Sequence, residues 1–355
     1  RGVSATSPSE GPALVDLEAI RGWSRRLAGV LEPTRPRVVG SIVLVTTTDR
    51  VVGLDLAKGT PLWTTKLDDT AYHTPIVRDD VVFIGDFSGR VRSLAAATGA
   101  TRWVAKLSPE QYGGMWRPAL SSDGYAAIAA TDGSVYGFNP DSGALCWRYT
   151  SPAAATEEEF QDTLLGVGSR ILGTSCAGEL LAWSAADGVI AWRRPMRDRM
   201  PNLGYRRDLF DLGDARIILL GGSGRHHCVV ERVDPRTGAA LWSVDVPDTG
   251  APQRAVAIGP DLLVMGVHCV VRLSGADGAE QWRHIGSPVD LCVSADDSRV
   301  FVLSTHGVHE LDGATGALLR ATKPQKKRYF STLVFEGDGL LISTFDGVLR
   351  LNWPH

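Results

Sequence analysis

A short signal built on glycine and tryptophan returns at an interval of about forty residues through most of the chain. The first strong copy reads Lys58-Gly59-Thr60-Pro61-Leu62-Trp63, and a degenerate copy at residues 315–320 ends in Arg320. The other copies end at Trp103, Trp147, Trp192, Trp242 and Trp282. A fixed period of this length indicates one supersecondary unit stacked many times. The repeat therefore constrains the fold more strongly than any single residue does.

Each repeat predicts four short β-strands. An apolar strand such as residues 51–54 precedes every glycine turn, and a second β-rich run such as residues 81–84 lies upstream of such a strand. The Gly, Asp and Ser residues between these two runs are typical of hairpin loops. The glycine of the signal is expected to have the positive φ of a tight turn, and the tryptophan is large enough to reach the neighbouring unit. Four strands in each repeat are typical of a β-propeller blade.

The number of copies predicts eight blades. The apolar strand occurs eight times, and so does the tryptophan strand when Gly22-Trp23 and the Arg320 copy are counted. The last apolar strand has no tryptophan strand after it, so residues 14–27 are expected to form the outer strand of the last blade and close the ring. The sequence thus predicts an all-β, eight-bladed propeller of four-stranded antiparallel blades over residues 13–355. Residues 1–12, rich in Ser, Gly and Pro, are expected to be a flexible leader or linker.

The turn Asp-x-x-Thr-Gly-x-x-x-Trp, preceded by a Val-x-x-Leu strand, resembles the tryptophan-docking repeat of the pyrroloquinoline-quinone-like (PQQ-like, BamB-type) propeller superfamily. The resemblance covers essentially the whole chain and implies the propeller fold. Members of that superfamily include quinoprotein alcohol dehydrogenases, BamB-type outer-membrane assembly scaffolds, sensor domains of bacterial Ser/Thr kinases and enzymes that use the central funnel.

The quinoprotein dehydrogenases stack their quinone on two adjacent cysteines beside a calcium or lanthanide ion. None of the five cysteines of this chain is adjacent to another, and no group of Asp, Asn and Glu stands out as a cage for a hard cation. A quinone-dependent dehydrogenase is therefore not expected. No cofactor and no metal site are predicted.

Composition limits the range of expected partners and the expected compartment of the protein. The formal charge of −3 gives no global field that would draw the protein to nucleic acid or to an anionic membrane. No apolar run approaches the length that spans a bilayer. The odd number of cysteines, at mixed places in the repeat, favours reduced thiols. A cytoplasmic monomer is expected, and because the chain begins at Arg1, export after removal of a leader is the alternative.

The candidate functional residues lie in the loops that connect the outer strand of one blade to the inner strand of the next. In a propeller these loops surround the central channel on one face, and loops on a rigid scaffold commonly carry function. The candidates for catalytic chemistry are His73, Tyr205 and Arg206, since a histidine can act as acid or base near neutral pH. The candidates for ligand binding are Tyr72, Trp116, Arg117, Gln161, Arg207, Arg254 and Tyr329.

Each of these candidates has a structural alternative. The arginines of residues 193–207 are most simply a solvated loop balanced by the acidic residues 157–159, and the alternative is a pocket that captures an anion or carboxylate. Trp116, which stands outside the repeat series, can stack on a ligand or pack under a long loop. His73 can instead hydrogen-bond to the backbone of a neighbouring blade.

The two halves of the chain differ at the third place of the Val-x-x-Leu strand. This residue is small in the first four blades and charged in the last four, as follows: Gly53, Ser93, Gly137 and Ala182, then Arg232, Arg272, Glu310 and Arg350. The alternating signs favour ion pairs of Arg272, Glu310 and Arg350 between adjacent blades. The alternative is that this half of the ring is remodelled for a ligand or partner.

Two classes of function remain. The favoured one is a non-catalytic platform whose loop face around the channel binds a protein partner or a small anionic or aromatic ligand. The alternative is an enzyme, of the lyase or cyclase type in a bacterial biosynthetic pathway, with its active site in the funnel. A deep funnel with converging polar groups would favour the enzyme.

Overall fold

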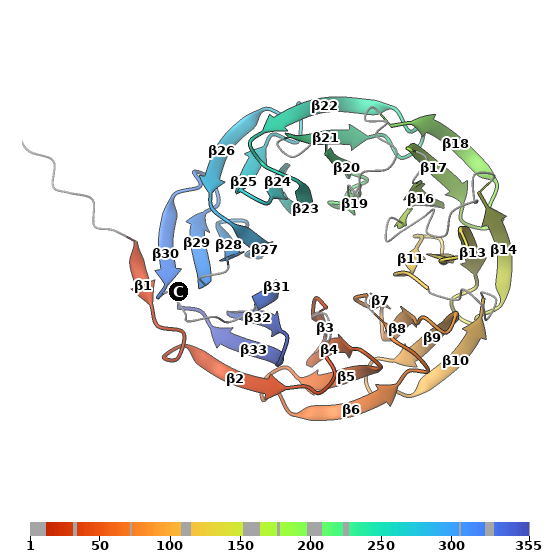
Figure 1. The fold of residues 1–355 in the computed structure, drawn as a ribbon, viewed down its shortest axis with the longest axis horizontal. Helices are drawn as coiled ribbons and strands as arrows, with labels where there is room; N and C mark the ends of the chain where they lie inside the picture. The colour runs from red at the N-terminus through yellow and green to blue at the C-terminus, as the bar shows by residue number, and fades with distance from the viewer. Residues whose placement is uncertain are drawn as a thin grey trace, which may run out of the picture.

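The computed structural model describes residues 12–30, 34–71, 73–107, 115–151, 164–175, 178–196, 208–222, 227–304, 307–323 and 330–354. All regular secondary structure in these ranges is β-strand, and the strands form eight sheets arranged in a closed ring (Figure 1). The chain is therefore an eight-bladed β-propeller, and the predicted fold class is confirmed. No helix in the described ranges has the length and apolar character needed to cross a lipid bilayer.

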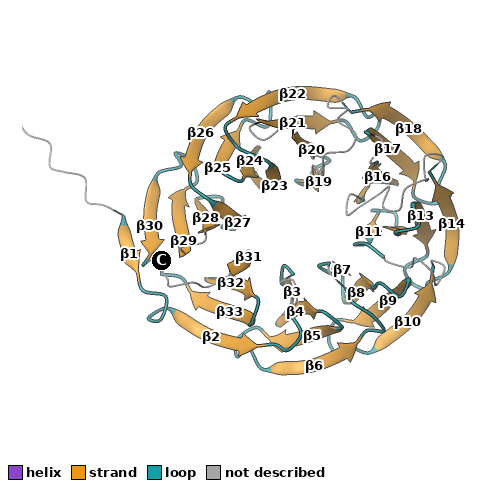
Figure 2. Ribbon diagram, viewed as in Figure 1, coloured by secondary structure: helices purple, strands orange, loops and turns teal. Residues whose placement is uncertain are grey.

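Each blade runs from an inner strand at the channel to an outer strand at the rim (Figure 2). Blade 1 consists of β3 (Arg37–Val39), β4 (Ile42–Thr47), β5 (Arg50–Asp55) and β6 (Pro61–Lys66). Blade 2 consists of β7 (Ile76–Arg78), β8 (Val81–Gly85), β9 (Arg90–Ala95) and β10 (Thr101–Lys106). Blade 3 consists of β11 (Ala119–Leu120), β12 (Ala126–Ala129), β13 (Ser134–Phe138) and β14 (Leu145–Thr150). Blade 4 consists of β15 (Leu165–Val167), β16 (Arg170–Thr174), β17 (Glu179–Ser184) and β18 (Ile190–Pro195).

The second half of the ring repeats this order. Blade 5 consists of β19 (Asp208–Asp211), β20 (Ile217–Gly222), β21 (His227–Val233) and β22 (Ala240–Pro247). Blade 6 consists of β23 (Pro252–Ile258), β24 (Asp261–Gly266), β25 (Cys269–Leu273) and β26 (Glu280–Ile285). Blade 7 consists of β27 (Pro288–Val293), β28 (Arg299–Ser304), β29 (Gly307–Asp312) and β30 (Leu318–Thr322). Blade 8 consists of β31 (Phe330–Glu336), β32 (Gly339–Thr344), β33 (Gly347–Asn352) and β2 (Arg21–Arg26).

The N-terminal segment closes the ring, but not as one strand. Strand β2 pairs antiparallel with β33, with Trp23 opposite Arg350, and so completes blade 8 as predicted. Strand β1 (Ala13–Val15) instead pairs in parallel with β30 and gives blade 7 a fifth strand. Leu17, between the two strands, is fully buried in the apolar cluster shared by blades 7 and 8. Burial of Leu17 explains why the chain passes from blade 7 to blade 8 at this point. The sequence analysis predicted a single strand over residues 14–27 and so missed the separate strand β1.

The core lies between blades, around their two central strands. Strand β8 is buried along its whole length, whereas the rim strand β6 exposes most of its residues. The apolar clusters join residues of neighbouring blades, as when Leu44 of blade 1 packs with Ile84 of blade 2. Because protein interiors are close-packed, such a core holds the ends of the inner strands in fixed positions.

The antiparallel order gives the ring two different faces. The connections from each rim strand to the next inner strand, together with the turns between second and third strands, lie on one face, called here the loop face. The glycine turns between third and fourth strands lie on the opposite, turn face. The glycines of the repeated signal have φ between 66° and 77°, as predicted for tight turns. The start of each inner strand therefore lies at the mouth of the channel on the loop face.

Candidate functional site

Seven tryptophans hold adjacent blades together. The indole N–H of each donates a hydrogen bond to a backbone carbonyl in the glycine turn of the next blade, over 2.8 to 3.1 Å. The ring also lies against the glycine of that turn, so that a Cβ on Gly99 would come within 2.3 Å of Trp63. The glycine is thus needed both for its positive φ and for the close approach of the indole. These tryptophans are structural.

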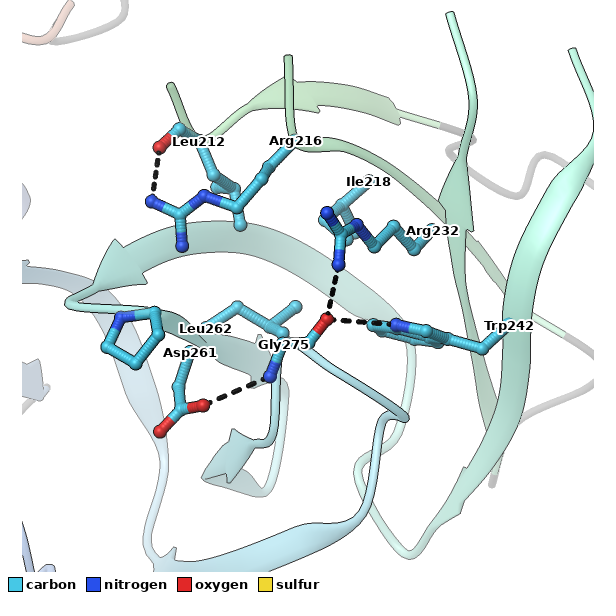
Figure 3. Close-up of a pocket in the computed structure, with 9 residues that line it drawn as sticks. Leu212, Arg216, Ile218, Arg232, Trp242, Asp261, Leu262 and Gly275 are labelled. Atoms are coloured by element: carbon cyan, nitrogen blue, oxygen red, sulfur yellow. Dashed lines mark hydrogen bonds between the residues drawn. The ribbon is translucent and has the colours of Figure 1, made fainter. Parts of the chain in front are cut away.

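The junctions of the arginine-containing blades have a second donor. In Figure 3 Arg232 and Trp242 converge on the carbonyl oxygen of Gly275, at 2.7 Å and 3.1 Å. Arg272 joins Trp282 on the carbonyl of Gly313 in the same way. The cavity beside Gly275 measures about 10 Å³, room for about one water molecule, so it is part of a blade junction and not a ligand site.

The predicted ion pairs among Arg272, Glu310 and Arg350 are not formed. Arg272 pairs with Asp261 and Arg350 with Asp338, each within its own blade. Glu310 faces Arg299 and Arg320, also in its own blade. The prediction was wrong because these side chains lie on equivalent strands of successive blades, where each guanidinium reaches a backbone carbonyl of the next blade instead.

The junction from blade 7 to blade 8 reverses the usual direction of the tryptophan contact. Arg320 occupies the tryptophan place and donates a hydrogen bond to the carbonyl of Pro354. Trp353, from the C-terminal end of the described chain, donates from its indole N–H to the buried Glu310 carboxylate over 2.8 Å. A tryptophan of the later blade thus reaches back to the earlier one, which compensates for the missing indole at position 320.

A buried carboxylate organises the channel mouth. Asp290, at the start of the inner strand of blade 7, is 4% exposed and forms ion pairs with Arg35 of blade 1 and with Arg254 of blade 6. The backbone N–H of Leu333 in blade 8 also donates to it, over 2.6 Å. Burial raises the pKa of Asp290, while the Arg35 guanidinium and the Leu333 N–H act in the opposite direction. One side chain therefore connects four blades.

Arg35 extends this network toward the first half of the ring. Its guanidinium also donates to the carbonyl of Leu333 over 2.6 Å, and its backbone N–H donates to the Thr74 hydroxyl over 3.1 Å. The neighbouring Arg37 is exposed to solvent, yet burial by surrounding protein lowers its pKa, and the charges of Arg117 and Arg35 lower it further. Arg37 begins β3, the inner strand of blade 1, and so lies at the channel mouth.

The rings of His73 and Trp116 are in contact. The two residues stand at equivalent places in neighbouring blades, each two residues before the proline of an X-Pro pair. Their ring centroids are 5.1 Å apart, and Phe87 contacts the edge of the same indole at 6.0 Å. The buried Nε1 of Trp116 has no hydrogen-bond partner among the described residues. Of the other candidates, Arg117 and Arg254 lie at the mouth, whereas Tyr72, Gln161, Tyr205, Arg206, Arg207 and Tyr329 fall outside the described residues.

Arg35 and Arg37 were not among the predicted residues, although the sequence holds a signal for Arg35. Arg35-Pro36 stands before the first inner strand as Thr74-Pro75 and Arg117-Pro118 stand before the next two. Alignment of the repeats at these X-Pro pairs places Arg35 and Arg117 at equivalent positions. The described cysteines, Cys146, Cys228, Cys269 and Cys292, are free thiols, in line with the prediction from their number.

The described residues include no group of three or more His, Cys, Asp or Glu side chains placed to hold a metal ion. Among the described residues, the channel mouth carries the guanidinium groups of Arg35, Arg37, Arg117 and Arg254 around the buried carboxylate of Asp290. This set is suited to binding an anion through charge-assisted hydrogen bonds.

The family model described as "Outer membrane protein assembly factor BamB" matches residues 18–210, 163–283 and 226–350. The chain belongs to this family. It is 26% identical over 215 residues to the outer membrane protein assembly factor BamB of Burkholderia pseudomallei, an alignment that covers 57% of this chain and 53% of that protein. It is 28% identical over 216 residues to BamB of Yersinia pestis, covering 58% and 51%. The matched region thus spans about half the length of these curated relatives.

Solved propellers share the fold at lower identity. The crystal structure of BamB from Moraxella catarrhalis superimposes with a TM-score of 0.70 at 20% identity, over 93% of this chain and 98% of that one. The computationally designed Ika8 protein gives a TM-score of 0.73 at 16% identity, over 96% and 100%. The C-terminal WD40 domain of Sif2 gives 0.71 at 11%, over 97% and 99%. At these identities the likeness concerns the fold alone.

Proposed function

We propose that this chain is a non-catalytic, protein-binding propeller of the assembly-factor type that acts in the cell envelope. The observation that carries the proposal is the match of the BamB family model along almost the whole ring. The relatives are named for the assembly of outer membrane proteins. That name supports the export alternative over the cytoplasmic location that composition suggested.

The contacts at the channel mouth support a binding role over a catalytic one. Asp290 is bound by two arginines and a backbone N–H, so its oxygens serve to join blades. His73 packs against Trp116, and Trp116 packs in turn against Phe87, which favours the structural interpretation of this histidine. The loop face around the mouth is then the surface through which the propeller would contact its partner.

Photocrosslinking in the source cells tests this proposal. A photoreactive amino acid would replace Arg50 or Arg117 on the loop face, and Lys58 on the turn face as the matched exposed control. We expect a discrete crosslink to a cell-envelope protein from the loop-face positions and none from position 58. Crosslinks of equal yield from both faces, or none from the loop face, would contradict a platform that binds through its loop face.

Two further measurements test the assembly role and the compartment. Cells that lack this chain are expected to contain less folded outer membrane protein, and unchanged amounts would argue against an assembly factor. Fractionation is expected to recover the protein with the envelope. Recovery in the cytoplasm alone would support the cytoplasmic location that the sequence predicted.

A further inference from the structure

Two histidines meet across the junction between blades 6 and 7. Nε2 of His284, on the rim strand β26, lies 3.3 Å from Nδ1 of His309, on strand β29 of blade 7. The ring centroids are 5.5 Å apart, and the ring planes form an angle of 89°. Both residues are half-buried, so protons from solvent can reach them. β26 ends at Ile285 and β29 begins at Gly307, so the pair lies at the loop-face end of this junction.

The repeat produces a contact between blades at the same place elsewhere in the ring. His284 stands two residues after the tryptophan of its rim strand, and His309 occupies the second place of the Val-x-x-Leu strand in the next blade. The residues at these two places between blades 4 and 5 are Arg194 and Glu231, and they form an ion pair. The contact of the two histidines is thus a regular part of the blade junction.

The junction between blades 5 and 6 fills the same place without polar groups. Its residues are Val244 and Val271, and Val244 packs against the apolar cluster that contains Val271. Three successive junctions therefore carry an ion pair, an apolar pair and a histidine pair. Of the three, the histidine pair is the one whose charge changes close to neutral pH.

The chemistry of imidazole limits the protonation states that this contact tolerates. A hydrogen bond between two imidazole rings requires one nitrogen that carries a proton and one that does not. Two neutral rings meet this condition, and so does a pair that has taken up one proton. When both rings are protonated, two N–H groups face each other and two positive charges repel. The contact is therefore favourable only while at least one ring is neutral.

The surroundings of His284 make acid the condition that breaks the contact. Burial lowers the pKa of His284, and the charge of His309 lowers it further. The unfolded chain therefore binds this proton at higher pH than the folded chain does. The stability from the pair is complete above the pKa of an unfolded histidine, about 6.5, and is lost as the pH falls below that value.

The charged groups near the pair are engaged with partners of their own. Val270 lies opposite His284, and Val302 lies opposite His309, on the adjacent strands. Among the described residues, the charged side chains on the facing sides of the two blades are Arg254 with Asp290, Asp261 with Arg272, and Lys323 with Asp16. The far sides of β26 and β29 carry Arg283 with Glu280, and Glu310 with Arg299 and Arg320. Compared with these groups, the histidines are the ones that titrate near pH 6.

The position of the pair connects it to the channel mouth. After His284 a short connection leads to β27, the inner strand that carries Asp290. The turn-face end of the same junction is held by Trp282 and Arg272 on the Gly313 carbonyl, and neither group changes charge near neutral pH. Loss of the histidine contact would therefore loosen the junction on the loop face and leave it closed on the turn face.

We propose that His284 and His309 form an acid-sensitive contact that holds the loop-face end of the junction between blades 6 and 7, and that protonation of both rings releases it and weakens binding of the protein partner. This inference rests on the proposed protein-binding function and adds its regulation. The histidines act through the position of the two blades and are not expected to contact the partner.

Urea denaturation from about pH 7.5 to about pH 5.5 tests the contact on the purified chain. The double variant His284→Val, His309→Val copies the apolar pair of the preceding junction. Between these pH values, the unfolding equilibrium constant of the wild type should increase about tenfold more than that of the double variant. His268→Gln, which removes an exposed histidine of blade 6, should keep the wild-type pH dependence. Equal pH dependence of the wild type and the double variant would overturn the contact.

The single variants distinguish a coupled pair from two independent histidines. His284→Val and His309→Val each remove the repulsion and leave one half-buried ring. Their separate losses of pH dependence should therefore add up to more than the loss in the double variant. Losses that add up to that of the double variant would mean that the two rings do not repel each other.

Nuclear magnetic resonance of the imidazole groups measures the same coupling in the folded state, whatever the stability of the double variant. We expect His284 of the wild type to take up its proton below about pH 6.5. In His309→Val the same proton should be taken up at higher pH, because the second charge is absent. An unchanged titration of His284 in that variant would overturn the coupling.

Crosslinking in cells separates failure of this inference from failure of the proposed function. The photoreactive residue at position 117 is used as described above, with cells held at about pH 7.5 and at about pH 5.5. The wild type should lose most of its crosslink in acid, and the double valine variant should keep it. A wild-type crosslink at full yield in acid, or an equal loss in the variant, would refute the regulation while the binding platform stands. Absence of a crosslink at both pH values would count against the platform itself.

Discussion

The first four blades and the last four are joined by different chemistry at the same place. In the first half the residue opposite the tryptophan is small, and a Cβ on Gly53 or Gly137 would come within 2.3 Å or 1.9 Å of the indole. In blades 5, 6 and 8 an arginine shares the tryptophan's carbonyl acceptor, as Arg232 does at Gly275. Arg350 and Trp23 share the carbonyl of Leu56 where the ring closes.

The comparison shows which feature the blade junctions of both halves share. The element common to both halves is a turn carbonyl held in place by a glycine of positive φ. In the first half of the ring the indole of a tryptophan donates to that carbonyl. In the second half, at blades 5, 6 and 8, a guanidinium donates to it as well. A solenoid-like array depends on each interface between neighbours, so each junction can be tested separately.

The largest expected effect is loss of a tryptophan in the first half. Trp63→Ala should reduce the free energy of unfolding by about 3 kcal/mol, because it removes a large half-buried ring and leaves the Ala96 carbonyl without its donor. Trp242→Ala should have the smaller effect, about 2 kcal/mol, since Arg232 still binds Gly275. Urea denaturation measures both, and equal losses would remove the proposed difference between the halves.

The next effect concerns the reversed junction between blades 7 and 8. Trp353→Phe keeps a ring against Phe301 but removes the indole N–H that binds the Glu310 carboxylate. We expect a loss of about 2 kcal/mol, since the acceptor is charged and buried. Leu319→Phe, at an exposed rim position of blade 7, serves as the control. A change in unfolding free energy no larger than that of the control would show that Glu310 does not depend on this indole.

A smaller loss of stability is expected when one of the two donors to the Gly275 carbonyl is removed. Arg232→Met should reduce stability by about 1 kcal/mol, because Trp242 continues to bind the Gly275 carbonyl. Combined with Trp242→Ala, it should reduce stability by more than the sum of the single changes, since only the double variant leaves that carbonyl without a donor. A double-mutant cycle measures this coupling, and strict additivity would mean that the two donors act independently.

The last prediction is a pH dependence of stability in the first half. Burial and the hydrogen bond to Asp132 raise the pKa of Tyr136 from 10.0 to about 12. The unfolded chain therefore releases this proton at lower pH than the folded one, and stability should fall as pH rises from 10 to about 12. Tyr136→Phe should show a shallower fall over the same range. Unfolding followed by fluorescence at several pH values would reveal parallel slopes if Tyr136 contributes nothing.

The sequence predicted the ring well because its signals are local and repeated. The positive φ of the turn glycines, the reach of the indole to the next blade and the completion of blade 8 by the strand of Trp23 follow from patterns within single repeats. The candidate site was predicted only in part. Arg117, Arg254, His73 and Trp116 could be placed at the loop face. Arg35 could be found only by alignment of the X-Pro pairs, and the partner of Arg35 and Arg254 could not be read from the sequence.

By itself the sequence determined the blade, its number of copies and the face on which functional loops gather. Only the tertiary structure decided three further contacts: Arg35 with Asp290, β1 with blade 7, and Trp353 with Glu310. The repeat period fixes the usual contacts between neighbouring units, whereas the first two of these contacts join segments far apart in the chain. They form because closing the ring brings its first and last blades together, and charge and burial then select the partners. The third joins two neighbouring blades, but it replaces the usual tryptophan contact and so could not be read from the repeat.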